Sequence, residues 1–396
     1  MSATRWVTIA ALLAVLSGCA ALPRGAAVPE SQTESATIPG IPQARLWLDR
    51  DSAPFVARVI RDTEREIEAL RAAGKPTDPL PPIYALAISG GGDEGAFAAG
   101  ILNGWTERGD RPQFKVVTGV SAGALIAPFA FLGARYDEVV RAVATTAGPN
   151  SILRKRNTLY GLASDGMTGS EPLAALIARY VTPEVLSEIA HEYQRGRALE
   201  IATTDLDAAR QVTWNMGEIA ANGSPAALEL FRKIMLASAS IPGIVSPVFV
   251  DVDVDGRRYQ EMHVDGAVTS QVFLYPRTLL RDYQRATGQT TMREIHTFVI
   301  RNGRLEPDWT NTPRRTLPIG SRALHTLVQT QGINDVLRLY EIARQDHADF
   351  NLAYIGADFK VTHCGEFDTE YMRGLFAYGR QAALEGRQWH PAPPNE

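Results

Sequence analysis

A serine between two glycines is the residue of this sequence best suited to act as a nucleophile. Gly119-Val120-Ser121-Ala122-Gly123 follows an apolar run at 114–117 and precedes an apolar helical pattern at 125–129. A G-x-S-x-G sequence between strand and helix is typical of a nucleophile elbow, in which a tight turn exposes the hydroxyl and the glycines avoid backbone clashes. We therefore expect Ser121 to be the nucleophile.

A second glycine-rich turn precedes this one. Gly90-Gly91-Gly92-Asp93-Glu94-Gly95 follows a short apolar run at 83–88, typical of a buried strand, and precedes an apolar helix pattern at 97–105. The literal G-x-G-x-x-G match suggests a dinucleotide site, but the two acids would repel a pyrophosphate, and 114–118 lacks the expected ribose-binding carboxylate. The loop can instead leave N–H groups free at a helix N-terminus, where they would hold an oxyanion.

The serine hydroxyl also needs a base, for which seven histidines and the carboxylates are the candidates. Residues 248–264 alternate around Asp255-Gly256, which predicts a β-hairpin with a type I′ turn. The return strand delivers Asp265-Gly266-Ala267, a pair that can be a base at a strand end or simply another turn. A calcium loop at 251–262 is disfavoured, because Met262 stands at the twelfth position, where a glutamate is needed.

The glycine-rich loop, the G-x-S-x-G turn and the Asp-Gly-Ala turn, in this chain order, resemble the patatin-like phospholipases, and specifically their bacterial lipoprotein members, from about Ile83 to Arg380. The resemblance implies a three-layer α/β/α sandwich with a mostly parallel central sheet. It also implies a dyad of Ser121 as nucleophile and Asp265 as base, with no metal or cofactor. The oxyanion hole would come from the loop residues Gly90, Gly91, Gly92 and Gly95; Gly91 and Gly92 would be the main donors, with Ala122 as a further one.

Two features of the sequence complicate the interpretation of these residues as a simple Ser–Asp dyad that acts on phospholipids. Glu94 stands where the family commonly has Arg or Lys, which weakens attraction of a phosphate headgroup, and the two acids can instead stabilise the following helix through its dipole. An unperturbed aspartate is also a poorer base than histidine by about 3.5 kcal/mol, so burial must raise its pKa. A triad with His296 or His325 is the rival arrangement, and His263 shares the strand face of Asp265 and could tune it.

The elements that carry these residues suggest four parts of the chain. We expect a lipoprotein signal peptide at 1–18, a lipidated Cys19 with a flexible tether at 19–45, a helical segment at 46–82, and the catalytic domain at 83–390. Leu16-Ser17-Gly18-Cys19 resembles a lipobox, and four prolines punctuate the tether. By the same resemblance, Ala20 in place of an aspartate after the cysteine implies an anchor in the outer membrane of a double-membraned bacterium, on its periplasmic side. Cys364 is expected to be a buried small hydrophobe.

Composition limits the functional alternatives. A net charge of −4 argues against a nucleic-acid binder, and the chain has no further apolar stretch long enough to span a membrane. The expected substrate is a lipid or other ester, hydrolysed through an acyl-enzyme, with 161–181 forming an acyl groove, a lid or ordinary core. A non-lipid serine esterase, thioesterase or peptidase and a non-catalytic envelope lipoprotein remain alternatives. The oligomeric state is open.

Overall fold

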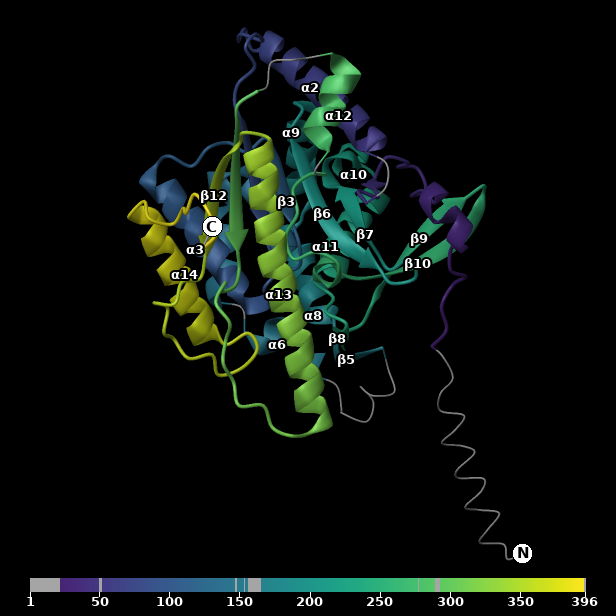
Figure 1. Ribbon diagram of the computed structural model, residues 1–396. Coiled ribbons are helices and arrows are strands. Elements are labelled where there is room, and N and C mark those ends of the chain that lie inside the picture. Colours follow the sequence, from purple (N-terminus) through teal and green to yellow (C-terminus); the bar gives the residue numbers. More distant parts are fainter. Residues whose placement is uncertain are drawn as a thin grey trace, which may run out of the picture.

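The central element is a mixed sheet that brings the glycine-rich motifs to one edge. The computed structural model describes residues 22–49, 52–146, 148–152, 154–155, 165–276, 278–288 and 293–394. Within them, nine strands form one sheet in the order β1-β7-β6-β3-β2-β11-β12, with β10 joining β6 and β9 joining β10 (Figure 1). The strands are β1 Arg45–Leu46, β2 Ile83–Ile88, β3 Val116–Gly119, β6 Ala198–Asp205, β7 Arg210–Asn215, β9 Val248–Val254, β10 Arg257–Asp265, β11 Ile295–Arg301 and β12 Asp349–Tyr354.

The middle of the sheet is parallel, and helices cover both faces. The pairs β6–β3, β3–β2, β2–β11 and β11–β12 are parallel, whereas β1, β7, β9 and β10 join in antiparallel fashion. The helices are α2 Ala53–Ala72, α3 Gly95–Arg108, α4 Ala122–Leu132, α5 Asp137–Thr146, α6 Pro149–Ile152, α8 Glu171–Tyr180, α9 Pro183–Gln194, α10 Met216–Asn222, α11 Pro225–Ser238, α12 Leu279–Thr287, α13 Thr316–Gln345 and α14 Thr369–Leu384. A small sheet adds β4 Arg154–Lys155, β5 Gly166–Gly169 and β8 Gly243–Val245.

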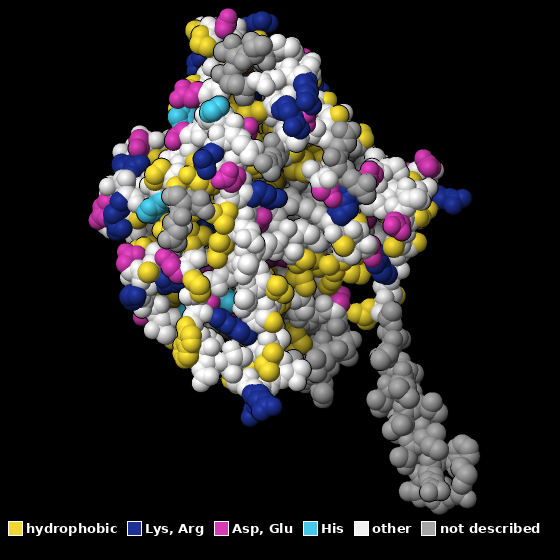
Figure 2. All heavy atoms as spheres, in the orientation of Figure 1, with side chains coloured by type: hydrophobic (Ala, Val, Ile, Leu, Met, Phe, Trp, Pro, Cys, Tyr) yellow, Lys and Arg dark blue, Asp and Glu magenta, His cyan; other side chains and the backbone are white. Residues whose placement is uncertain are grey.

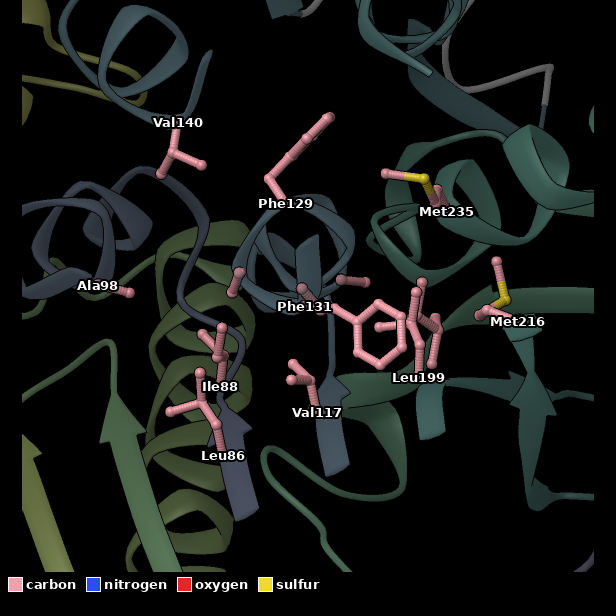
Figure 3. Packing of buried hydrophobic residues seen from close by; sticks show 14 of the residues in the cluster. Leu86, Ile88, Ala98, Val117, Phe129, Phe131, Val140, Leu199, Met216 and Met235 are labelled. Carbon is pink, nitrogen blue, oxygen red and sulfur yellow. The ribbon is translucent and has the colours of Figure 1, made fainter. Parts of the chain in front are cut away.

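Alternating side chains of the sheet supply two separate cores. Along β2, Leu86 and Ile88 enter the larger cluster, whereas Ala85 and Ala87 enter a cluster with α13 on the opposite face. Figure 3 shows Leu86, Ile88, Val117 and Leu199 facing α4, with the Phe131 ring above Val117 and Leu199. Burial of both faces explains why β2 is a continuous apolar run, and the expected α/β/α fold with a mostly parallel sheet is confirmed.

Local predictions from the sequence agree with these elements to within a few residues. The run at 83–88 is β2, and the helical segment expected at 46–82 contains α2. The strand expected at 114–117 begins two residues later, as β3. The hairpin is β9–β10, and Asp255 and Gly256 both have positive φ, 52° and 78°, as a type I′ turn requires.

The N-terminal segment differs from the expected tether. Arg24 forms an ion pair with Asp207, and Thr37 exchanges two backbone hydrogen bonds with Asp253. Ile38 and Ile41 are buried in the main core. Residues 24–45 are therefore fixed to the domain, because their few apolar side chains find cover against the sheet edge. The expected signal peptide at 1–18 and Cys19 lie outside the described residues.

The surface mixes charges of both signs. On the face shown in Figure 2, Lys and Arg side chains are interspersed with Asp and Glu, and hydrophobic side chains reach the surface in several places. Among the described residues, no helix combines the length and the apolar character that a membrane span requires.

Candidate active site

The sheet register brings Ser121 and Asp265 together. Strand β3 runs parallel to β6 and ends where Gly119 pairs with Ile201, whereas β10 runs antiparallel and ends where Asp265 pairs with Thr203. The two strands therefore approach each other end to end along the same side of β6. Two residues of a strand span about 6.6 Å, so the turn after β3 meets the end of β10. The Ser121 Oγ to Asp265 Oδ2 distance is 2.7 Å.

Ser121 sits in a strained turn that the flanking glycines permit. Its φ of 54° and ψ of −122° are rarely adopted by residues other than glycine. A Cβ at Gly123 would lie 2.2 Å from the Ile88 carbonyl oxygen, and one at Gly119 would lie 2.5 Å from that of Gly123. The Ser121 N–H donates to Ser238 Oγ at 3.0 Å, and this hydroxyl donates to the Ala202 carbonyl. Ser238, the last residue of α11, thus also helps to fix the serine turn.

Asp265 is buried and held in one orientation. Its side chain is 2% exposed, Oδ2 accepts from Ser121, and Oδ1 accepts from the Ala267 N–H at 2.8 Å. The backbone N–H of Asp265 donates to the Ser240 carbonyl, and Thr204 Oγ1 donates to the Asp265 carbonyl. Burial raises the pKa of Asp265 to about 7, against the opposing effect of the two hydrogen bonds to its carboxylate.

The glycine-rich loop offers some of the expected N–H donors but not all of them. The Gly90 N–H donates to the Gln271 carbonyl, and the Gly95 N–H closes the short turn at 92–94, so the expectation that these two would serve as donors is wrong. Within the described part of the chain, the N–H groups of Gly91, Gly92 and Ala122 have no hydrogen-bond partner. A Cβ at Gly90 would lie 3.1 Å from Ser121 Cβ, so the loop is adjacent to the serine.

An apolar pocket opens beside the serine. Gly92, Ser121 and Ala122 line it at one end, and the side chains of α4, α5, α8 and β8 form most of its wall. The apolar wall residues include Leu125, Ile126, Phe129, Val139, Val140, Val143, Ile152, Leu173, Leu176, Ile244, Val245, Phe367 and Met372. Two of them, Leu173 and Leu176, come from the stretch 161–181, of which 161–164 lies outside the described residues. The apolar lining suits a hydrocarbon chain.

The acids of the loop contact the C-terminal part of the chain. Asp93 Oδ2 accepts from His363 Nε2 and from the Phe367 N–H, both at 2.8 Å. Glu94 Oε1 accepts from the Tyr371 hydroxyl at 3.2 Å, and burial raises the pKa of Glu94 to about 6. Both acids thus have specific partners beyond any helix-dipole effect. Cys364, expected to be buried, is exposed in this segment.

The histidines considered as alternative bases lie elsewhere. His296 pairs with Asp349 near the start of β11, at the opposite end of the sheet from Ser121, and His325 on α13 pairs with Asp308. His263 is fully buried, with Nδ1 on Thr203 Oγ1 and Nε2 on Glu261 Oε2, so both ring nitrogens are engaged away from the Asp265 carboxylate. These contacts support neither a catalytic triad with His296 or His325 nor an effect of His263 on the Asp265 carboxylate.

One cluster of buried side chains could be considered as a set of metal ligands. Asp205, Glu261 and His263 each place one ligand atom within 4.8 Å of the others. Glu261, however, is already paired with Arg45, and His263 Nε2 must donate to its carboxylate. Thr203 Oγ1, which accepts from Trp214 Nε1, can then donate to His263 Nδ1. Arg45, Thr203 and the hydrogen bond between Glu261 and His263 therefore satisfy these two side chains without a cation.

Comparison with known proteins identifies the domain. Residues 86–276 match the family model of patatin-like phospholipases, so this part of the chain is a patatin-like phospholipase domain. The family supports a lipid-acting hydrolase in general terms. Among solved structures, VipD from Legionella pneumophila is similar with a TM-score of 0.36 and 9% identity, over 77% of this chain and 67% of that chain. The comparison with curated proteins gave no significant match.

Proposed function

We propose that this protein is a serine acyl hydrolase that cleaves carboxylic esters of lipids through Ser121 and Asp265. The observation that carries the proposal is the 2.7 Å hydrogen bond between the two side chains at the end of an apolar pocket. The patatin-like domain supports a lipid as the substrate. Because burial raises the pKa of Asp265 to about 7, this carboxylate is as basic as an ordinary histidine, which removes the usual handicap of an aspartate base.

In the proposed mechanism, Ser121 Oγ attacks the ester carbonyl while its proton passes to Asp265 Oδ2. The tetrahedral oxyanion accepts hydrogen bonds from the free N–H groups at Gly91, Gly92 and Ala122. Asp265 then gives the proton to the departing alcohol, which leaves an acyl-enzyme. A water molecule attacks this ester with Asp265 again as base, and the fatty acid leaves as Ser121 recovers its proton. The apolar pocket holds the acyl chain during both steps.

Labelling with a long-chain fluorophosphonate tests the proposal. Purified protein beginning after Cys19 should gain one adduct, mapped to Ser121 by mass spectrometry, that is absent in Ser121→Ala and at least about 100-fold slower to form in Asp265→Asn. Asp205→Asn is the matched control, because Asp205 is also buried on the neighbouring strand and accepts two backbone N–H groups. Unchanged labelling in Asp265→Asn would overturn the dyad.

Substrate comparison separates the alternatives. Hydrolysis of long-chain phospholipid in mixed micelles and of long-chain p-nitrophenyl esters should exceed that of short soluble esters. Faster turnover of short esters would favour a non-lipid esterase, and a folded protein without any adduct would favour a binding role. His296→Gln and His325→Gln should keep full activity, since His296 pairs with Asp349 at the other end of the sheet and His325 pairs with Asp308.

We further propose that the protein is anchored by lipid on Cys19 and acts at the cell envelope. The support is the sequence Leu16-Ser17-Gly18-Cys19 behind an apolar run. Expression of the full chain with Cys19→Ala as a control tests this. The wild-type protein should partition into the detergent phase and carry an acylated N-terminal cysteine by mass spectrometry, and the variant should do neither.

A further inference from the structure

A buried arginine lies behind the glycine-rich loop and has no role in the chemistry above. Arg301 is the last residue of β11 and is 4% exposed. Its Nη1 lies 3.3 Å from both Ser89 Oγ and the Gly90 carbonyl oxygen, and 3.4 Å from that of Asn302. Within the described ranges no carboxylate oxygen lies within 4.0 Å of it, although Glu94 and Asp335 are near enough to interact with its charge, and its Nε is buried without a partner. Burying a cation without a directly paired carboxylate is costly, so the polar groups that it contacts are the ones that must stabilise it.

The contact to Gly90 fixes a candidate oxyanion donor. The Gly90 carbonyl and the Gly91 N–H belong to one planar trans peptide, so they point in opposite directions. Ser89 Oγ donates to the same carbonyl at 2.7 Å, and the Asn302 N–H in turn donates to Ser89 Oγ. With its carbonyl held by two donors, the peptide cannot rotate. The Gly91 N–H, which has no partner among the described residues, is thereby directed away from Arg301.

The order of the strands places Ser121 on that opposite side. Strand β2 lies between β11 and β3, and Ile88 pairs with Ile300 on one side and with Gly119 on the other. Arg301 therefore approaches the end of β2 from the β11 side, and the serine turn approaches from the β3 side. The close approach of Gly90 to Ser121 Cβ places the peptide between the two.

Glycine is required at position 91 for the same arrangement. A Cβ there would lie 2.3 Å from the Asn302 carbonyl oxygen, so the loop packs directly on the residue after Arg301. The Asn302 side chain reinforces this packing: it donates to the Ser89 carbonyl and accepts from the Ala98 N–H. The loop is thus attached to the end of β11 through main chain and side chain alike.

We propose that Arg301 is a positioning residue of the oxyanion hole, which holds and polarises the Gly90–Gly91 peptide so that its N–H stabilises the oxyanion formed on attack by Ser121. The inference rests on the proposed hydrolase function. A donor to a peptide carbonyl strengthens the N–H of the same peptide, and a fixed positive charge in a low-dielectric site favours negative charge nearby. Because Arg301 acts through the peptide, it matters mainly in the transition state.

The test compares Arg301→Gln and Arg301→Lys with wild type on a long-chain p-nitrophenyl ester. Loss of one direct oxyanion donor typically costs 10²–10³ in rate, so the indirect loss in Arg301→Gln should lower kcat by about 10- to 100-fold. KM should stay within about threefold. The Ki of a long-chain trifluoromethyl ketone, whose serine adduct carries an oxyanion, should rise in proportion to the loss of kcat/KM. Arg301→Lys should show a smaller kcat loss, about 3- to 10-fold.

Arg197→Gln is the matched control for the loss of a buried arginine. Arg197 is 7% exposed and also donates to backbone carbonyls, those of Phe114 and Phe131, but it has no contact with the glycine-rich loop. This variant should lose stability while kcat stays within about threefold of wild type. An equal kcat loss in Arg197→Gln and Arg301→Gln would overturn the proposal.

Other outcomes are equally decisive. A kcat within threefold of wild type in Arg301→Gln, or an unchanged Ki for the ketone, would refute the role of Arg301. If Arg301→Gln does not fold, Arg301→Lys alone suffices: a wild-type kcat there contradicts the proposal, and a loss confined to kcat with a matching rise in Ki supports it. Failure of the wild-type protein to hydrolyse esters and to label at Ser121 would instead refute the hydrolase function itself.

Discussion

Asp93 accepts a hydrogen bond from His363 Nε2 at 2.8 Å, which joins the glycine-rich loop to the segment before α14. The same carboxylate oxygen accepts from the Phe367 N–H, and Glu366 and Phe367 line the apolar pocket. One side chain of the loop therefore holds part of the pocket wall. Cys364 lies exposed within this segment, and once Cys19 is removed no other cysteine remains in the sequence.

Replacing Asp93 should loosen this segment. A fluorophore on Cys364 should show lower anisotropy in Asp93→Ala than in wild type, because two hydrogen bonds to a charged acceptor are lost. Unfolding should become easier by about 1–3 kcal/mol, measured with denaturant. Asp110→Ala, which removes an exposed ion pair with Arg108, is the control and should change neither quantity appreciably. Equal anisotropy in the two variants would contradict the assignment.

Activity should depend on pH through Asp265. A base must be deprotonated to accept the serine proton, and burial raises the pKa of Asp265 to about 7. We expect kcat/KM to rise with pH, with a midpoint near 7, and to level off above it. The pKa of Glu94 is raised to about 6, so the contribution of this nearby group to the pH profile must be distinguished from that of Asp265. Glu94→Gln should leave the midpoint in place; a midpoint that disappears in this variant would assign the profile to Glu94.

The same pKa makes Asp265 a cost to stability at neutral pH. The carboxyl binds its proton more tightly in the folded state than in the unfolded state, where its pKa is near 3.8, so folding is progressively disfavoured as the pH rises from about 4 to 7. At pH 8 the cost amounts to at most roughly 4 kcal/mol. Asp265→Asn should therefore melt about 2–6 °C above wild type at pH 8 and show no difference near pH 4. A lower melting temperature at pH 8 would count against the raised pKa.

Filling the pocket should shorten the preferred acyl chain. Leu176 on α8 lines the pocket and is partly exposed, so a larger side chain can be accommodated by protruding into the cavity. Leu176→Trp should lower kcat/KM for esters with a 16-carbon acyl chain by about tenfold or more. This loss corresponds to the roughly 1–3 kcal/mol that a few lost methylene contacts are worth. Esters of four carbons should be hydrolysed as in wild type. A parallel decline for both lengths would indicate general damage.

The two residues of the proposed dyad could be found in the sequence because their signals are local. Ser121 lies in a strand–turn–helix motif, and Asp265 follows a hairpin whose alternation is readable, so each could be found without knowing the fold. The structure brings the two together through the register of β3 and β10 on β6. The sequence alone offered no reason to prefer Asp265 over a histidine; that preference came from the family resemblance.

The supporting residues could not be found in the same way. Ser238 and Arg301 act on the elbow and the loop across 117 and 211 positions of sequence, and neither belongs to a pattern with a known chemical meaning. Gly90 was misjudged because its N–H donates to the Gln271 carbonyl, which is remote in the sequence, and Gly95 because its N–H closes a short turn that the motif does not predict. The tether was misread because Ile38 and Ile41 are too few to form a periodic pattern, although both are buried and help to fix a segment whose other side chains are mostly exposed.

The N-terminal segment has a further consequence for the β9–β10 hairpin, which projects from the sheet. The Gln260 N–H donates to the Ala26 carbonyl on one side of the hairpin, and Thr37 pairs with Asp253 on the other. Without this segment, both sides of the hairpin would present unpaired backbone groups, the feature that promotes edge-to-edge association of β-proteins. Residues 24–46 thus cover both edges of the hairpin and protect the protein from aggregation. A truncation that removes them would make the protein prone to self-association.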